Sequence, residues 1–263
     1  MLLIADNLQI TNKEIAQSIT DRNPEPIKKL ILAAVAAGAD AIDINPGPLP
    51  KHAAEIITFL VNTVQSVTRK PILLDTTNAA AIEAGLVASK NKVIINGFSL
   101  EASKCADILP LAKIFDVDII GYLLYPDNRV PTDESDFFGI ALELLAETEK
   151  AGIPPERLII DPVVAPLIWE NGIAHNLSML SFLARLHELA GFPIRSIAGL
   201  SNLTSGGHAP REKKRLAEHA FLSMMAAAGL DMVLLQIFHE DTVRTARMCE
   251  AITGGKIFSW ASL

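Results

Sequence analysis

Short, continuous apolar runs recur along the whole chain, and each one ends in polar residues or glycine. Because the runs do not alternate apolar and polar positions, they are typical of parallel strands buried on both faces. Eight such runs occur: LLIADN (2–7), AIDINPG (41–47), PILLDTTN (71–78), KVIINGFS (92–99), DIIGYLLYP (118–126), RLIIDPVV (157–164), RSIAGLSN (195–202) and LDMVLLQIF (230–238). We therefore expect eight buried strands.

Longer segments between these runs have apolar residues three and four positions apart, which predicts helices. Gly38 is placed to end one helix and Asn78 to cap the start of another. The predicted helices cover residues 26–38, 52–68, 79–89, 137–152, 177–190 and 213–229. Strands that alternate with helices over this length predict an α/β fold, a single (β/α)8 TIM barrel spanning residues 1–263.

A doubly wound open sheet is the alternative architecture. Such a sheet normally has a glycine-rich turn after its first strand, whereas this chain continues with ADNLQITN. The barrel is therefore the favoured fold.

Composition narrows the class of protein. The chain has 263 residues, of which 50% are hydrophobic, and its net charge of −7 argues against a nucleic-acid partner. The two cysteines lack metal-ligand spacing, and no apolar run approaches the roughly 18 residues of a membrane span. The N-terminus, MLLIADNLQI, lacks the basic start and long apolar run of a signal peptide. We expect a soluble, cytoplasmic protein without a membrane partner.

Carboxylates and amides gather where the predicted strands end, and these ends form the active site of a TIM barrel. A single Asp or Asn after a strand commonly caps a helix, but several of them converging on one rim indicate a binding site. The residues are Asp6, Asn7, Asp43, Asn45, Asp75, Asn96, Asp161, Ser201, Asn202 and Gln236. A carboxylate there can accept two hydrogen bonds from an amino-pyrimidinone, and the amides match the remaining donors and acceptors.

Other kinds of chemistry lack support in the sequence. No lysine ends a predicted strand, no GxSxG motif is present, and the histidines do not cluster, so we expect no metal site. His208 and His239 fall in strand-end loops, and the sequence leaves their roles open.

The strand-end motifs can be compared with a known family as a set. IDINPG (42–47), LLDTTN (73–78), IINGFS (94–99), IIDPVV (159–164) and GLSN (199–202) resemble those of the pterin-binding, dihydropteroate synthase-like TIM barrels. Within that family the chain is most similar to the methyltetrahydrofolate:corrinoid protein methyltransferases. The resemblance runs from the first strand to the last helix, and five motifs in order are far more specific than one.

The resemblance implies a reaction and a set of residues for it. A methyl group would move between N5 of tetrahydrofolate and the cobalt of a corrinoid (cobalamin) held by a separate corrinoid protein. Family members are generally homodimers, and the chain would need no metal of its own. The pterin ring would be bound by Asp75, Asn96 and Asp161 with Asp43 at the same mouth, Asn202 would contact N5 as the catalytic residue, and Arg211 would match a family arginine that follows this asparagine.

The chain also departs from the family's pattern. Acetogenic members have Gly-Glu-Arg-Ile-Asn after the first strand, where this chain has Ala5 to Gln9, reading ADNLQ. The difference suggests a branch with another corrinoid partner, such as an O-demethylase or a methylamine-type system.

Two alternatives to this reading stay open. One is a dihydropteroate synthase, although that enzyme's Asp-Ser-Phe-Ser-type stretch is replaced here by DINPGPLP. The other is a non-catalytic pterin-binding barrel, against which the position of Asn202 argues.

Overall fold

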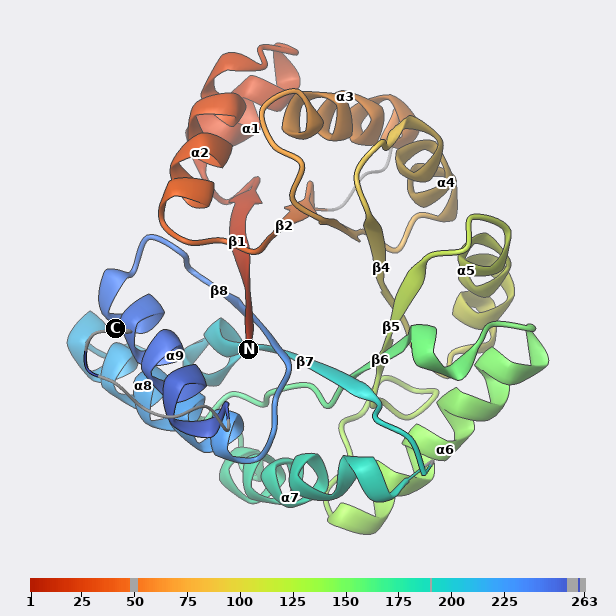
Figure 1. The fold of residues 1–263 in the computed structure, drawn as a ribbon, viewed down its shortest axis with the longest axis vertical. Coiled ribbons are helices and arrows are strands. Elements are labelled where there is room, and N and C mark those ends of the chain that lie inside the picture. The colour runs from red at the N-terminus through yellow and green to blue at the C-terminus, as the bar shows by residue number, and fades with distance from the viewer. Residues whose placement is uncertain (48–51, 190, 255–259, 261–263) are drawn as a thin grey trace.

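A computed structural model describes residues 1–47, 52–189, 191–254 and 260. Within these residues, eight parallel strands close into a barrel in sequential order, and helices surround them (Figure 1). The strands are β1 (Leu2–Gln9), β2 (Ala41–Asn45), β3 (Ile72–Asp75), β4 (Val93–Phe98), β5 (Asp118–Tyr122), β6 (Leu158–Asp161), β7 (Arg195–Gly199) and β8 (Met232–Leu235). The predicted TIM barrel is confirmed.

The helices form the outer layer of the barrel (Figure 1). None in the described part of the chain has both the length and the apolar character of a transmembrane segment. They are α1 (Lys13–Thr20), α2 (Glu25–Ala36), α3 (Ala53–Gln65), α4 (Ala79–Ala88), α5 (Ala102–Ile114), α6 (Glu134–Lys150), α7 (Gly172–Arg185), α8 (Arg211–Ala227) and α9 (Glu240–Thr253), with short 3-10 turns at η1 (Pro155–Arg157), η2 (Leu186–Glu188) and η3 (Leu200–Thr204).

The helix predictions hold where the apolar pattern is strong. All six predicted helices occur, and the Asn78 side chain caps α4 by accepting a 3.0 Å hydrogen bond from the Ala81 amide. Gly38 follows α2 with a φ of +101°, a conformation that suits glycine. The structure adds α1, α5 and α9, which the pattern did not predict, and Ala190 at the end of one predicted helix lies outside the described residues.

Two apolar layers hold the barrel together. The outer layer lies between strands and helices, and the inner layer fills the barrel with side chains such as Leu73, Ile94, Ile120 and Ile159. Because alternate residues of a strand point to the same face, the side chain two positions further on also points inward. On β3 to β6 those positions are polar, and they are Asp75, Asn96, Tyr122 and Asp161.

An irregularity in β1 shapes the same end of the barrel. Ala5 pairs with Ile42, but Leu8 pairs with Ile44, so one extra residue is accommodated on β1. Such a bulge bends a strand and redirects its side chains. The bulged segment contains Asp6 and Asn7, which follow the last regularly paired residues at the mouth of the barrel.

Candidate functional site

Side chains from neighbouring strands meet at the mouth and form one hydrogen-bonded group. The Asn96 amide on β4 lies 3.4 Å from a carboxylate oxygen of Asp43 on β2 and accepts a 2.8 Å hydrogen bond from the Tyr122 hydroxyl on β5. Asp43 and Asn96 are only 1% and 6% exposed. The structure therefore brings together residues that are 53 and 26 positions apart in the chain.

Asp161 on β6 lies at the same mouth and is 8% exposed. We refer to Asp43, Asp75, Asn96 and Asp161 together as the ring of acceptors. One of its carboxylate oxygens accepts a 2.7 Å hydrogen bond from the amide of Val163, whose φ is +60°. The carbonyl of Val163 in turn lies 2.7 Å from Nε2 of the buried His175. His175 also has its Nδ1 2.7 Å from the carbonyl of Pro131, so it links the loop after β6 to the loop before α6.

Burial changes the protonation of these carboxylates. Loss of hydration raises the pKa of Asp161 to about 7, and burial together with the charge of Asp6 raises the pKa of Asp75 to about 6. The pKa of Asp43 is raised well above its usual value by burial and by the nearby Asp75 and Asp6. Hydrogen-bond donors from a bound ligand would offset this cost, because they stabilise the charged form.

The end of β1 contributes two further side chains at the mouth. Gln9 donates a hydrogen bond to the carboxylate of Asp6, whose pKa is raised by burial. Asn7 donates to the side chain of Gln236 and accepts a 3.1 Å hydrogen bond from the Ile237 amide. Asn7 and Gln236 therefore join β1 to the segment after β8. The charge of Asp6, in contrast, raises the pKa values of Asp43 and Asp75.

Asn202 lies in η3, directly after β7, and both it and Ser201 are exposed. The amide nitrogen of Asn202 packs against Gly199. A Cβ atom placed on Gly199 would lie 3.2 Å from this nitrogen. In the part of the chain that the structure describes, no protein group forms a hydrogen bond with this side-chain amide. Asn202 can therefore offer a donor or an acceptor to a ligand at the mouth.

Arg211 begins α8 and is exposed. It lines a groove of about 410 Å³ together with Arg215, His219 and Asp241, between α8 and the start of α9. Its predicted contact with the pterin stays a prediction, as do roles for two histidines of the mouth loops. His208 is exposed, and the pKa of His239 is lowered by partial burial and then by the charge of Arg215.

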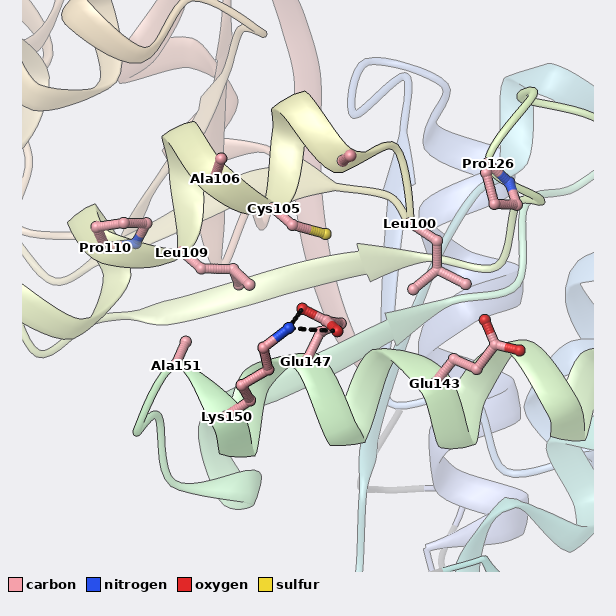
Figure 2. A pocket seen from close by; sticks show the side chains of 11 residues that line it. Leu100, Cys105, Ala106, Leu109, Pro110, Pro126, Glu143, Glu147, Lys150 and Ala151 are labelled. Carbon is pink, nitrogen blue, oxygen red and sulfur yellow. Dashed lines mark hydrogen bonds and ion pairs between the residues drawn. The ribbon is translucent and has the colours of Figure 1, made fainter.

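A second groove, of about 600 Å³, lies on the outer wall of the barrel between α5 and α6 (Figure 2). It contains an ion pair of 3.3 Å between Glu147 and Lys150, and the Cys105 thiol, whose pKa is raised by burial. None of the predicted site residues lines it. A protonated thiol is a poor nucleophile, so burial makes Cys105 less reactive.

The chemistry available at the mouth is recognition by buried oxygen acceptors and amides. The described residues include no group of three His, Cys, Asp or Glu side chains placed to hold a metal ion. Tyr122 and His175 belong to the site or its support, and the sequence pattern did not single them out. Tyr122 lies within an apolar run, where a tyrosine is ordinary, and His175 is one of six histidines that do not cluster in the sequence. Neither residue could therefore be recognised from the sequence pattern.

The mouth of the barrel has the features of a binding site for a polar heterocycle. Carboxylates and amides that lie at the strand ends can hydrogen-bond to the edge of such a ring. The family model for pterin binding enzymes matches residues 8–236, and the chain belongs to that family.

Individual relatives are more distant. The chain is 24% identical over 257 residues to a protein from Eubacterium limosum named methylcorrinoid:tetrahydrofolate methyltransferase, with 97% of this chain and 92% of that protein covered. Among solved structures, the dihydropteroate synthase from Xanthomonas albilineans in complex with 7,8-dihydropteroate is similar with a TM-score of 0.75, 20% identity and coverage of 97% and 95%. The Yersinia pestis enzyme with a pterine-sulfa conjugate is similar with a TM-score of 0.72, 17% identity and coverage of 97% and 94%. These structural similarities show a shared fold.

Proposed function

We propose that this chain is a methyltransferase that moves a methyl group between N5 of tetrahydrofolate and the cobalt of a corrinoid carried by a separate protein. The observation that carries the proposal is the set of acceptors at the ends of β2, β3, β4 and β6, with the exposed Asn202 at the end of β7, whose side-chain amide has no hydrogen bond to any described residue. The name of the Eubacterium limosum relative supports the same reaction, written from the methylcorrinoid toward tetrahydrofolate.

The buried side chains would hold the pterin ring. The carboxylates of Asp75 and Asp161 each accept hydrogen bonds, and a pterin presents a ring N–H and an exocyclic amino group to such an acceptor. The amide of Asn96 offers a donor near Asp43. Bidentate recognition by a carboxylate fixes the plane of the ring and so directs N5 toward the open side of the mouth.

Asn202 would act at N5 itself. In transfer toward the folate, the N5 lone pair forms a bond to the methyl carbon, the cobalt–carbon bond breaks with its electron pair going to cobalt, and N5 loses its proton to water. In the opposite direction, an electron pair of the reduced cobalt forms the bond to the methyl carbon, and N5 keeps the pair of the broken N–C bond and takes up a proton. A rotatable amide can accept from an N5–H or donate to the N5 lone pair, which stabilises the changing charge at that atom.

The partner and the assembly follow from the same proposal. The corrinoid belongs to a partner protein, which would approach the exposed side of the mouth where Asn202 and Ser201 lie. We further propose a cytoplasmic homodimer, as the resemblance to the family implies. Sedimentation equilibrium of the purified protein tests the dimer.

The direct test uses free cobalamin in place of the corrinoid protein. Purified protein is mixed with methylcobalamin and tetrahydrofolate, and separately with cob(I)alamin and methyltetrahydrofolate, while cobalt absorbance is followed. We expect equal amounts of cobalamin and folate to be converted, and Asp161→Asn to abolish the conversion. Robust synthesis of dihydropteroate from a pterin pyrophosphate and 4-aminobenzoate would show a synthase instead. Folate binding without either reaction would show a non-catalytic binding protein.

A further inference from the structure

Tyr122 stands between the apolar interior of the barrel and the polar mouth. It is the last residue of β5, it packs against the inner apolar layer, and it pairs in register with Asp161 on β6. Its hydroxyl is close to the carboxylates of Asp75 and Asp161, whose charges act on it. The phenol therefore lies inside the ring of residues proposed to bind the pterin.

Two contacts fix the orientation of the neighbouring Asn96 amide. The Asn96 NH2 group faces Asp43 and donates to one of its carboxyl oxygens, at 3.4 Å. The carbonyl oxygen of the amide then faces Tyr122, whose hydroxyl donates to it at 2.8 Å. The two contacts agree on one orientation, and among the described residues the Tyr122 hydroxyl is the group that donates to the Asn96 oxygen.

We infer that Tyr122 is a positioning residue, which holds the Asn96 amide so that its NH2 group is available at the mouth. The site would then favour a ligand that places a hydrogen-bond acceptor opposite this NH2 group. This inference rests on the proposed binding of a pterin. Without the hydroxyl, the Asn96 oxygen would be buried without a donor, and the amide could rotate to present its oxygen to the ligand. An oxygen facing a pterin acceptor would repel it.

The hydroxyl is suited to remain a donor. Burial and the neighbouring carboxylates of Asp75, Asp161 and Asp43 raise the pKa of Tyr122 well above its usual value. The phenol therefore stays protonated throughout the range in which the carboxylates titrate. The Tyr122 hydroxyl can therefore keep donating to the Asn96 oxygen when the charge of these carboxylates changes.

A double-mutant cycle tests this role by calorimetric binding of tetrahydrofolate. We expect Tyr122→Phe to weaken binding on the order of tenfold when Asn96 is present. In an Asn96→Ala background the same substitution should change the affinity by less than about twofold, because the group that it positions is gone. Tyr125→Phe is the matched control, since this second tyrosine lies in the loop after β5 with its ring against Arg129 and should leave the affinity unchanged.

A ligand-free measurement separates this role from the proposed function. In a nitrogen–proton correlation spectrum, the side-chain amide signals lost in Asn96→Ala identify Asn96. These signals should shift in Tyr122→Phe and stay in place in Tyr125→Phe. Unshifted signals, or equal losses of affinity with and without Asn96, would overturn the positioning role. Absence of tetrahydrofolate binding by the unmutated protein, with the signals shifted as expected, would overturn only the proposed function.

Discussion

The side chain of Asn45, at the end of β2, donates a 2.6 Å hydrogen bond to the carboxylate of Asp75, at the end of β3. The oxygen of the same amide accepts a 3.0 Å hydrogen bond from the Gly47 amide, which fixes the direction of the donor. Among the described residues this is the hydrogen bond that the Asp75 side chain accepts, so both of its oxygens keep acceptor sites for a ligand. Asn45 also lowers the pKa of Asp75, which burial has raised to about 6.

Replacement of Asn45 by alanine should change the pH dependence of folate binding. The hydrogen bond stabilises the charged form of Asp75, so its loss raises the pKa of Asp75 further above about 6. Binding needs the charged acceptor, and the affinity of the unmutated protein should therefore decline as the pH falls through this value. In Asn45→Ala we expect the midpoint of this decline to move upward by roughly one pH unit. Calorimetric titrations between pH 5 and pH 8 measure it, and an unchanged midpoint would contradict the coupling.

Removing the charge of Asp161 should stabilise the protein without ligand at alkaline pH. Burial raises the pKa of this carboxyl to about 7 in the folded state, so its contribution to stability is full below the unfolded pKa and is lost as the pH rises through 7. The shift from about 4 corresponds to an increase of about 2–4 kcal/mol in the free energy of unfolding of Asp161→Asn at pH 8. The asparagine can still accept the hydrogen bond from Val163.

Urea unfolding of Asp161→Asn and of the unmutated protein at two pH values provides the measurement. The difference should shrink below about 1 kcal/mol at pH 4, where the folded carboxyl is neutral and the unfolded one is about half protonated. A difference of the same size at both pH values would show that the Asp161 charge is not the cause. The same variant should lose folate binding, because the NH2 group of the asparagine would face one of the two pterin donors where the carboxylate had an oxygen.

The strands could be predicted because buried parallel strands are written in the sequence as continuous apolar runs. All eight were found, whereas α1, α5 and α9 were not predicted. The pattern also did not predict the bulge between Ala5 and Leu8, because register depends on pairing with β2. Local patterns therefore predict helices and strands, whereas irregularities within a strand depend on contacts with segments that are distant in the sequence.

Part of the site followed from the same rule. Asp43, Asp75, Asn96 and Asp161 stand out because a polar residue interrupts or ends an apolar strand. Tyr122 did not stand out, since a tyrosine within an apolar run is ordinary, and its direction depends on the register between β5 and β6. The contacts of the Asn45 and Asn7 amides likewise depend on neighbouring strands. The sequence therefore identified the candidate ligand-binding groups, but it did not identify Tyr122 or the contacts that Asn45 and Asn7 make.

Asn7 is expected to matter for stability more than for binding. It joins β1 to the segment after β8 through the amide of Ile237, which is 1% exposed. In Asn7→Ala the buried amide loses its acceptor, so the free energy of unfolding should fall by about 1–3 kcal/mol while folate affinity stays within about twofold. Gln236→Ala is the control, because it leaves the bond to Ile237 intact and should cost less. A loss of affinity without a loss of stability would assign Asn7 to the ligand instead.

In the proposed reaction, Asp75, Asn96 and Asp161 bind the pterin, and Asn202 acts on the reacting nitrogen. Single-turnover methyl transfer by Asn202→Ala, at saturating folate and with Ser201→Ala as the neighbouring control, tests it most directly. We predict that folate affinity stays within about threefold while the transfer rate falls on the order of 100-fold, as for the loss of one hydrogen bond made in the transition state. An unchanged rate, or a rate that falls only as far as the affinity does, would contradict the account.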